Sequence, residues 1–435
     1  MPGADEIAVE AYVFGYPLVI MDATRRLATS VAQATAQRAP TNQFAHFRAY
    51  PDSTFKDRAS PNADTLYSLA WLDLTHGPIV LSVPEMGNRY YLMPMLDAWT
   101  NVFAAPGTRT TGNSAGDFAI TGPGWSGRLP PKTTRIAAPT NTAWLIGRTE
   151  TRGQSDYTAV HKIQERYCLR DLDSWGNGYR PPNRRCVGPW VDAITPPVMQ
   201  VARMDAATFF SRLTALMASN PPAAADADAV ARFSSVGIRA GLPINENTIT
   251  PVLRVGVEGG RAKLCADALR THGDVVNGWE FAPNHTGDCG TDYVWRAIAA
   301  MRSLGANLNA DTIYLRATND ADGQPLIGTR CYSIRFNDGQ LPPVNAFWSI
   351  TLYKSNGTFA DNSLGRHAIH HLDALSKEQD GSIVIRLQRT SPGKERESNW
   401  LPTPSDSITL ILRLYWPSKV VLEGGWRPPV IKREP

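Results

Sequence analysis

The stretch PNADTLYSLAWLDLTHGPIVLSVPE, residues 61–85, decides the fold class. It contains two apolar runs rich in β-branched and aromatic residues, and they flank a turn at His76 and Gly77. Apolar runs separated by turn residues predict antiparallel strands. Similar runs follow at 89–96, 99–105, 117–122 and 142–149. We therefore expect residues 36–170 to form a first β-rich domain, an antiparallel sandwich or barrel.

The same signal returns after Leu304, which predicts a second β-sandwich domain over residues 305–435. Its expected strands are 312–318, 329–336, 346–353, 382–389 and 407–416. Between the two domains, apolar residues recur at helical spacing in 157–172, 206–219 and 291–305. Residues 171–304 are therefore predicted to be a helical and loop-rich connecting region.

The N-terminal segment, residues 1–35, is predicted to be helical. The helical pattern runs from residue 5 to residue 30, begins at acidic residues and ends at Arg25 and Arg26, which suits the helix dipole. Pro17 is expected to kink or divide this helix. The predicted fold class is a β-rich α+β protein with two antiparallel β-sandwich or barrel-like domains.

Composition narrows the class of protein. A chain of 435 residues is too long for one ordinary core, so two domains are expected. Hydrophobic residues make up 43% and charged residues 19%, which favours folded domains over disorder. The net charge is only +4 and the arginines are scattered, which argues against a nucleic-acid partner. No run of about 18 uninterrupted apolar residues predicts a transmembrane helix.

Cysteine spacing and the N-terminus bear on location. Cys168 and Cys186 bracket one loop and Cys265 and Cys289 another, which leaves Cys331 alone. Two loop-closing disulfides are one interpretation, and five unrelated thiols are the other. Disulfides persist in oxidising compartments, so the first interpretation favours a periplasmic or secreted mature form. The N-terminus lacks signal-peptide features, so a cytoplasmic location stays open.

Two sets of segments resemble known families. Residues 61–85, RYYLMPMLDAWTNVFAAPGTRTTG at 89–112, and AGDFAITGPGW at 115–125 resemble the bacterial domain of unknown function 1254. The segments LPPVNAFWSITLYKSNGTF at 341–359, NWLP at 399–402 and LRLYWP at 412–417 resemble its usual companion, domain of unknown function 1214. The resemblance implies two β-rich domains in this order, an envelope or secreted location for many members, and no settled reaction.

Polar residues beside strands of the first domain form a candidate site. Asp64 and Asp97 are a carboxylate pair that could act as acid and base or hold a divalent cation, the one cofactor considered. Arg109 and Arg148 are candidate anion binders, and Trp99 could stack on a sugar ring. The remaining candidate substrate-binding residues are Asn62, Tyr67 and Asn101. The alternative is that Asn and Asp at strand entries bond their own backbone.

Two further motifs are weaker. GNSAG at 112–116 matches a nucleophile elbow with Ser114 as nucleophile and His161 as base, but a strand rather than a helix is expected after it. HAIHH supplies His367, His370 and His371, which would suit zinc only on a helix. We interpret these histidines as surface or interface residues, and the polar and aromatic residues of the second domain as mostly structural.

These observations support two hypotheses. The first is an envelope hydrolase that acts on a glycan, ester or phosphoester through Asp64 and Asp97. The second is a non-catalytic ligand-binding or assembly protein built from two β-sandwiches. Both expect a small-molecule or glycan partner and allow a homo-oligomer, and fold alone does not discriminate between them.

Overall fold

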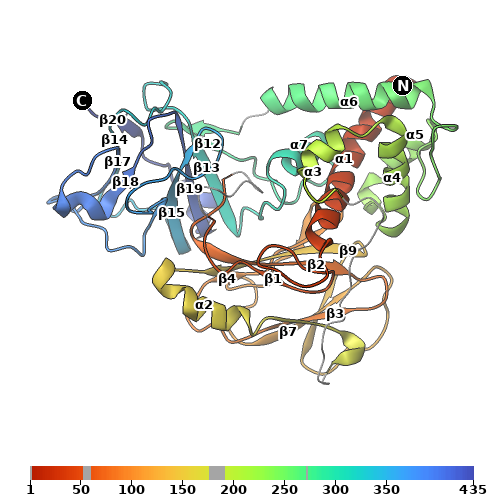
Figure 1. Ribbon diagram of the computed structural model, residues 1–435, viewed down its shortest axis with the longest axis horizontal. Coiled ribbons are helices and arrows are strands. Elements are labelled where there is room, and N and C mark those ends of the chain that lie inside the picture. The colour runs from red at the N-terminus through yellow and green to blue at the C-terminus, as the bar shows by residue number, and fades with distance from the viewer. Residues whose placement is uncertain (1, 52–59, 176–191, 271–272) are drawn as a thin grey trace.

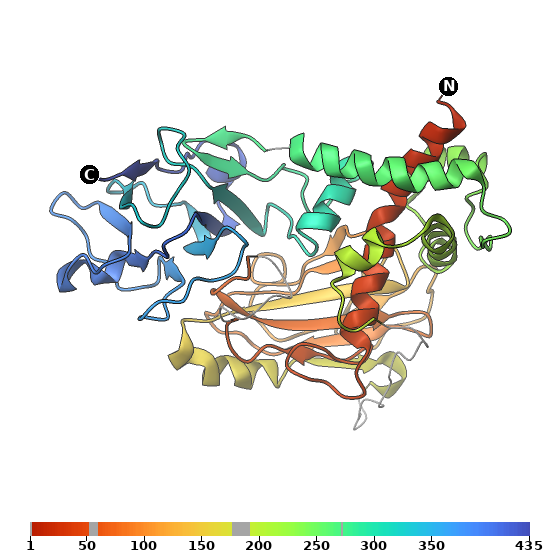
Figure 2. The same ribbon diagram turned by 45° about the horizontal axis from the view of Figure 1, so that its top comes forward.

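The computed structural model describes residues 2–51, 60–175, 192–270 and 273–435. Figure 1 shows two β-rich parts side by side, with a group of helices packed beside them. The turned view in Figure 2 shows the same arrangement, with α6 lying across α1. The predicted β-rich α+β class with two β-sandwich domains is confirmed.

The first domain contains two sheets that face each other. One sheet has the order β1-β2-β9-β5-β6, with β4 also paired to β9, and the other has the order β10-β3-β7-β8. The strands are β1 (Ala45–His46), β2 (Thr65–Asp73), β3 (Ile79–Val83), β4 (Tyr91–Leu92), β5 (Met95–Asp97), β6 (Val102–Ala104), β7 (Gly116–Thr121), β8 (Thr133–Ala137), β9 (Thr142–Glu150) and β10 (Cys168–Asp171). The helix α2 (Tyr157–Gln164) follows β9.

Alternation along β2 and β9 gives the first sheet two buried faces. Ala70, Leu72 and Leu145 point into the core between the two sheets. Trp71 and Trp144 point the other way and stack with their ring centroids 4.7 Å apart. Since successive side chains of a strand lie on opposite faces, the segments 69–72 of β2 and 143–146 of β9 are apolar on both faces because each face packs against another layer of the protein.

The helices form a core of their own. They are α1 (Ala4–Thr29), α3 (Pro197–Ala202), α4 (Ala206–Ser219), α5 (Ala227–Ser234), α6 (Pro251–Arg270) and α7 (Tyr293–Arg302). α1 continues through Pro17 as one helix, so Pro17 does not divide it, and the kink stays a prediction. Among the described residues, α1 is a helix long and apolar enough to cross a membrane, and 78% of its most apolar window is buried in the protein.

The sequence analysis missed α6 because its glycines weaken a helical pattern. The structure gives these glycines a packing role. A Cβ at Gly256 would lie 2.7 Å from the Cβ of Ala8, and one at Gly260 would lie 2.4 Å from the ring of Tyr12. Glycine therefore lets α6 approach α1 closely.

The second domain also contains two sheets. Their orders are β11-β12-β13-β19-β15-β16 and β18-β17-β14-β20. The strands are β11 (Val275–Val276), β12 (Trp279–Phe281), β13 (Thr312–Ala317), β14 (Tyr332–Phe336), β15 (Val344–Lys354), β16 (Ala368–His370), β17 (Ile383–Gln388), β18 (Trp400–Pro402), β19 (Ile408–Pro417) and β20 (Ile431–Arg433), and the short helix α8 (Lys419–Leu422) follows β19. β11 and β12 come from the region predicted to be connecting.

Cys265 and Cys289 do not form the disulfide that one of the two interpretations assigned to them, and they fit the other interpretation, unrelated thiols. Both residues are free thiols, with Cys265 exposed on α6 and Cys289 buried. Cys168 is also free, and its expected partner Cys186 lies outside the described residues. Cys265 and Cys289 therefore give no support to an oxidising compartment.

Candidate functional site

The two β-rich domains meet through one sheet of each. Along β19, Leu410, Leu412 and Leu414 point into the second domain's core. Arg413 and Tyr415 lie at alternate positions of the strand and point toward the first domain, where Tyr415 joins a cluster with Trp71 and Trp144. We call this outward side of the β13-β19-β15-β16 sheet the interface face.

A polar row crosses the interface face. Backbone pairing places Ser349 of β15 directly opposite both His370 of β16 and Arg413 of β19. Arg413 is in turn opposite Tyr314 of β13. Residues opposite one another on neighbouring strands have Cβ atoms about 5 Å apart, so the row brings one hydroxyl, one imidazole, one guanidinium and one phenol together.

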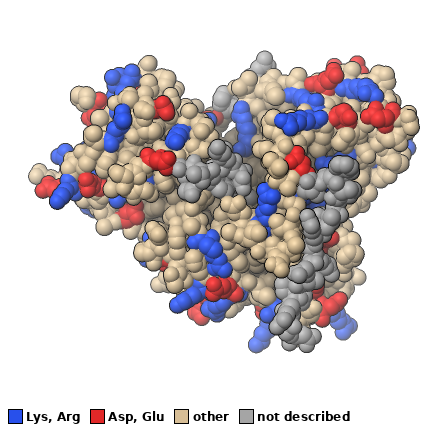
Figure 3. Space-filling view, in the orientation of Figure 1, with Lys and Arg blue, Asp and Glu red and all other residues tan. Residues whose placement is uncertain are grey.

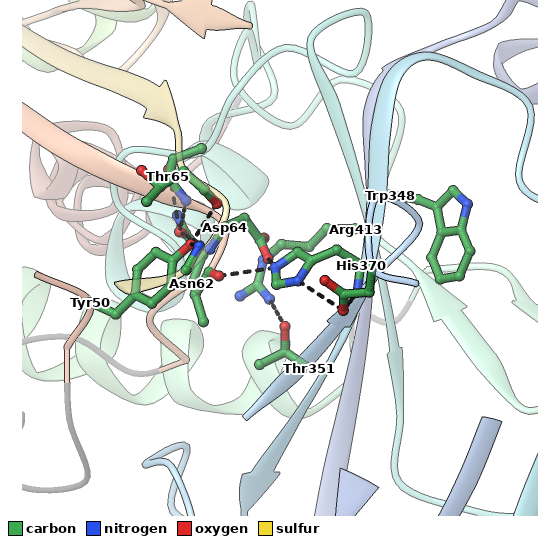
Figure 4. Close-up of polar contacts among 12 residues, drawn as sticks. Tyr50, Asn62, Asp64, Thr65, Trp348, Thr351, His370 and Arg413 are labelled. Carbon is green, nitrogen blue, oxygen red and sulfur yellow. Dashed lines mark hydrogen bonds and ion pairs between the residues drawn. The ribbon is translucent and has the colours of Figure 1, made fainter. Parts of the chain in front are cut away.

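Asp64 enters this row from the first domain. Its side chain is fully buried, and His370 Nε2 donates to Oδ1 at 2.9 Å (Figure 4). The Tyr415 hydroxyl donates to Oδ2 at 2.7 Å. Asn62 fixes the strand entry, since its Oδ1 accepts from the backbone N–H groups of Asp64 and Thr65. Asp64 is therefore an interdomain anchor, and both its oxygens are occupied by donors.

His370 lies between two carboxylates. Its Nδ1 is 3.5 Å from Asp373 Oδ2, and its side chain keeps 18% exposure. Burial alone would lower the pKa of His370, but the hydrogen bonds and charges of Asp373 and Asp64 raise it to about 10. Burial alone would raise the pKa of Asp64, and His370, Arg413 and Tyr415 lower it. The pair is thus an imidazolium and a carboxylate at neutral pH.

This protonation state decides what the row can do chemically. Ser349, His370 and Asp64 resemble a catalytic triad in composition, but a general base must be neutral with a free nitrogen facing the nucleophile. Both ring nitrogens of His370 face carboxylates. The Ser349 hydroxyl has no hydrogen-bond partner among the described residues. The geometry therefore does not activate Ser349.

Arg413 is a buried cation whose neighbours satisfy it. Its guanidinium donates to Thr351 Oγ1 at 2.9 Å, to the Tyr353 hydroxyl at 2.8 Å and to the Ser60 carbonyl at 3.0 Å. Burial opposes the charge, but Tyr353 and Asp64 outweigh it and raise the pKa of Arg413. The sequence analysis had interpreted this residue as structural, which fits its contacts.

Arg148, on β9, is a buried cation whose neighbours do not satisfy all of its donors. Its side chain is 6% exposed. It donates to the Tyr67 hydroxyl and the Gly305 carbonyl, both at 3.3 Å, and its guanidinium lies over the Tyr67 ring, 5.1 Å from the ring centroid. Its Nε has no partner, and none of the ion pairs among the described residues includes it. Burial lowers the pKa of Arg148, and the phenols of Tyr67, Tyr314, Tyr415 and Tyr90 raise it. A buried charge without a counter-ion is unusual in a folded protein.

Two further buried polar atoms have no hydrogen-bond partner among the described residues. The Tyr90 hydroxyl is buried without a partner, and Asp311, Arg148 and Tyr314 act on it electrostatically. Asn307 Oδ1 is also buried without a partner, while its Nδ2 donates to the Tyr314 hydroxyl at 3.2 Å. We call Arg148, Tyr90, Asn307 and Tyr314 the interdomain cluster. Its atoms without a partner are two donors, Arg148 Nε and the Tyr90 hydroxyl, and one acceptor, Asn307 Oδ1.

The predicted site residues divide into two groups. Asn62, Asp64, Tyr67 and Arg148 lie together at the domain interface, as the contacts above show. Arg109 lies near them and forms a two-point ion pair with the buried Asp311, at 2.7 and 3.0 Å. The residues Asp97, Trp99 and Asn101 lie elsewhere.

Asp97, Trp99 and Asn101 form a turn that faces the helices. Asp97 Oδ1 accepts from the backbone N–H groups of Trp99 and Asn101, and the Trp99 ring packs on Phe14 of α1. Burial raises the pKa of Asp97 to about 6. Asp97 flanks Ala143 at one end of β9, whereas Asp64 bonds Thr151 just beyond the other end. At about 3.3 Å per residue, that strand separates the two by roughly 25 Å. The structure does not bring the two carboxylates together.

No group of three or more His, Cys, Asp or Glu side chains that could hold a metal is found within residues 2–51, 60–175, 192–270 and 273–435. A surface pocket of about 580 Å³ lies where α1 and α7 begin. Its carboxylates include Asp5 and Glu6 in the first turn of α1 and Asp292 at the N-cap of α7. Since acidic groups stabilise helix N-termini, they have a structural explanation there. Figure 3 shows side chains of both signs interspersed on one face of the molecule.

The fold and interface define a class of protein. Its members have two β-sandwich domains with a layer of helices beside them, and the two domains enclose polar side chains where they meet. Residues 41–171 match the family described as protein of unknown function DUF1254, and residues 311–419 match the one described as protein of unknown function DUF1214. The chain therefore belongs to the proteins that carry a DUF1254 domain followed by a DUF1214 domain, as predicted. No curated protein matches it.

Two solved structures are similar to this chain to different degrees. The VPA0106 protein from Vibrio parahaemolyticus is 22% identical, with a TM-score of 0.75 and full coverage of both chains. An uncharacterized protein from Burkholderia cenocepacia is 13% identical, with a TM-score of 0.47 over 98% of this chain and 88% of the other. The first similarity shows that the whole two-domain arrangement exists in another protein.

Proposed function

We propose that this protein binds a small anionic molecule between its two β-sandwich domains, with Arg148 as the residue that holds the negative charge. The observation that carries the proposal is the buried Arg148 guanidinium with an unused Nε–H and no carboxylate partner among the described residues. An anion that accepts from Nε would supply the missing counter-ion.

The position of Arg148 supports a binding site. It lies where two domains meet, which is a common place for small-molecule sites. Burial raises the pKa of the neighbouring Tyr90, so its unpartnered hydroxyl can donate a hydrogen bond without adding a competing negative charge at neutral pH. Such a set of neighbours is suited to an anion and unsuited to a cation.

Binding fits the geometry better than the hydrolase hypothesis does. That hypothesis required Asp64 and Asp97 in one pocket, and they stand at opposite ends of β9. Asp64 also has both oxygens occupied by His370 and Tyr415. The proposal therefore follows the second hypothesis, a non-catalytic ligand-binding protein.

Thermal unfolding of the full chain tests the proposal. Sodium propionate should raise the midpoint relative to sodium chloride at equal ionic strength, because a ligand that binds only the folded state stabilises it by about 2.7 kcal/mol at 100 times its Kd. Arg148→Met should abolish the rise. Arg335→Met, which changes an exposed arginine on β14, should keep it. A wild-type midpoint that ignores propionate, or an equal rise in Arg148→Met, would overturn the proposal.

A further inference from the structure

Three arginines gather around one carboxylate near the end of α1, and none of them belongs to the interdomain cluster. Arg25 donates to Oδ1 of Asp22 at 2.7 Å, and Arg26 donates to Oδ2 at 2.8 Å. α4 packs on α1 in the helical core, and its Arg212 has Nε 3.9 Å from the same Oδ2. We call Arg25, Arg26 and Arg212 the arginine cluster.

The charges of these four side chains do not balance. Asp22 is buried, and both of its oxygens already accept from Arg25 and Arg26. One carboxylate among three guanidinium groups leaves a surplus of two positive charges. Burial and the charges of Arg26 and Arg25 lower the pKa of Arg212, while Asp22 raises it. The helix dipole favours basic residues near the end of α1, but Arg212 lies in the middle of α4 and has no such explanation.

The arginine cluster is open to solvent, unlike Arg148. The side chains of Arg25, Arg26 and Arg212 keep 22%, 37% and 23% exposure, whereas that of Asp22 keeps 2%. Because the Nε atoms of Arg26 and Arg212 approach the same oxygen, they lie within about 7 Å of each other, a span that one phosphate group can bridge. Guanidinium groups also match the geometry of phosphate oxygens. A ligand can therefore reach both arginines from solvent.

We infer that the arginine cluster binds a phosphate group that carries two negative charges, either as inorganic phosphate or as the end of a phosphomonoester. The phosphate oxygens accept from Arg26 and Arg212, and Arg25 stays with Asp22. Two negative charges balance the surplus, and the buried Asp22 fixes the arginines beneath the ligand. This site is separate from the one proposed at Arg148 and does not depend on it.

Titration calorimetry with the full chain at pH 8 tests the inference. Inorganic phosphate and methyl phosphate are then close to doubly charged, and dimethyl phosphate carries one charge. Dimethyl phosphate should bind roughly tenfold more weakly than the other two, or less. Arg26→Met and Arg212→Met should each weaken both dianions by roughly tenfold, because each removes charge-assisted hydrogen bonds. Arg148→Met and the surface control Arg335→Met should leave these affinities unchanged.

Asp22→Asn separates a binding site from a structural ion-pair network. It removes the carboxylate charge that competes with the ligand, so it should tighten the binding of inorganic phosphate. A purely structural network predicts lost stability and no phosphate binding in any variant. If Asp22→Asn does not fold, the two arginine variants decide, since Arg26 and Arg212 are partly exposed.

The outcomes distinguish this site from the interdomain one. Binding of either dianion that depends on Arg26 and Arg212 supports the inference, and the tighter of the two shows whether free phosphate or a phosphomonoester is preferred. The inference is overturned if neither dianion binds, if dimethyl phosphate binds as tightly, or if the arginine variants bind like wild type. Binding that only Arg148→Met abolishes would also overturn it, because that anion would occupy the interdomain site.

Discussion

Arg148 and Arg413 offer a matched pair of substitutions. Both are buried arginines at the same domain interface, with 6% and 3% exposure. Replacement of each by Met removes the charge and keeps much of the apolar volume. We expect Arg413→Met to lower the free energy of unfolding strongly and Arg148→Met to leave it nearly unchanged or raise it, in buffer without added carboxylates.

The contacts set the expected magnitudes. Arg413→Met removes three hydrogen bonds and one of the two cations that stabilise the buried Asp64 carboxylate, a change of the kind that destabilises by about 3–5 kcal/mol. Arg148→Met removes two hydrogen bonds of 3.3 Å, together about 1–2 kcal/mol, and a cation–π contact with the Tyr67 ring, while Tyr67 keeps its hydrogen bond from Asn62. Relief of an unpaired buried charge offsets that loss. The two variants should therefore differ by roughly 3 kcal/mol or more.

Urea denaturation followed by tryptophan fluorescence measures the difference, because Trp71 and Trp144 pack in the cluster that joins the domains. Propionate should then raise the unfolding free energy of Arg413→Met, provided that this variant folds, and should leave that of Arg148→Met unchanged. If Arg148→Met loses as much stability as Arg413→Met, the Arg148 charge is already compensated in the free protein and the reasoning is refuted.

Two more predictions concern the polar row. Since the folded-state pKa of His370 is raised to about 10 from 6.5, its contribution to stability should be fully present below pH 6.5 and lost as pH rises through about 10. The gap in unfolding free energy between wild type and His370→Asn should therefore shrink between pH 6 and pH 10, and a constant gap would contradict the assignment. Ser349→Ala should change unfolding free energy by less than about 1 kcal/mol and leave propionate binding intact, because the hydroxyl is unpartnered; lost binding, measured by calorimetry, would show that it contacts the ligand.

Strand patterning explains why so much of the fold could be predicted. Runs such as 65–74 and 407–416 are long, mostly apolar and bounded by turn residues, and they coincide closely with the long strands β2 and β19. Short strands such as β11 and β16 lack this signal, since two or three residues carry no measurable alternation. α6 was missed for a different reason, because its glycines serve contact with α1.

The candidate site was only half predictable. Asn62, Asp64, Tyr67 and Arg148 could be proposed because they belong to one domain and one stretch of strands. Their partners are about 160 to 350 residues away along the chain, as with Gly305 for Arg148 and Tyr415 for Asp64. No local spacing encodes that proximity. One signal was available: Arg413 and Tyr415 occupy alternate positions of an otherwise apolar strand, which indicates a strand with a second, polar contact surface.

Arg413 and Arg148 both interrupt the apolar pattern of a strand, but they differ in how fully the protein satisfies their donors. Arg413 breaks the apolar pattern of β19 and is satisfied by Thr351, Tyr353 and Ser60, so the protein itself supplies every group needed to keep it buried. Arg148 breaks the pattern of β9 in the same way, yet the described chain supplies only phenols and one carbonyl. A methionine there would fill the space without an unpaired charge. Local rules are violated most often where function requires it, and a group from outside the chain is what would make arginine the better residue at this position.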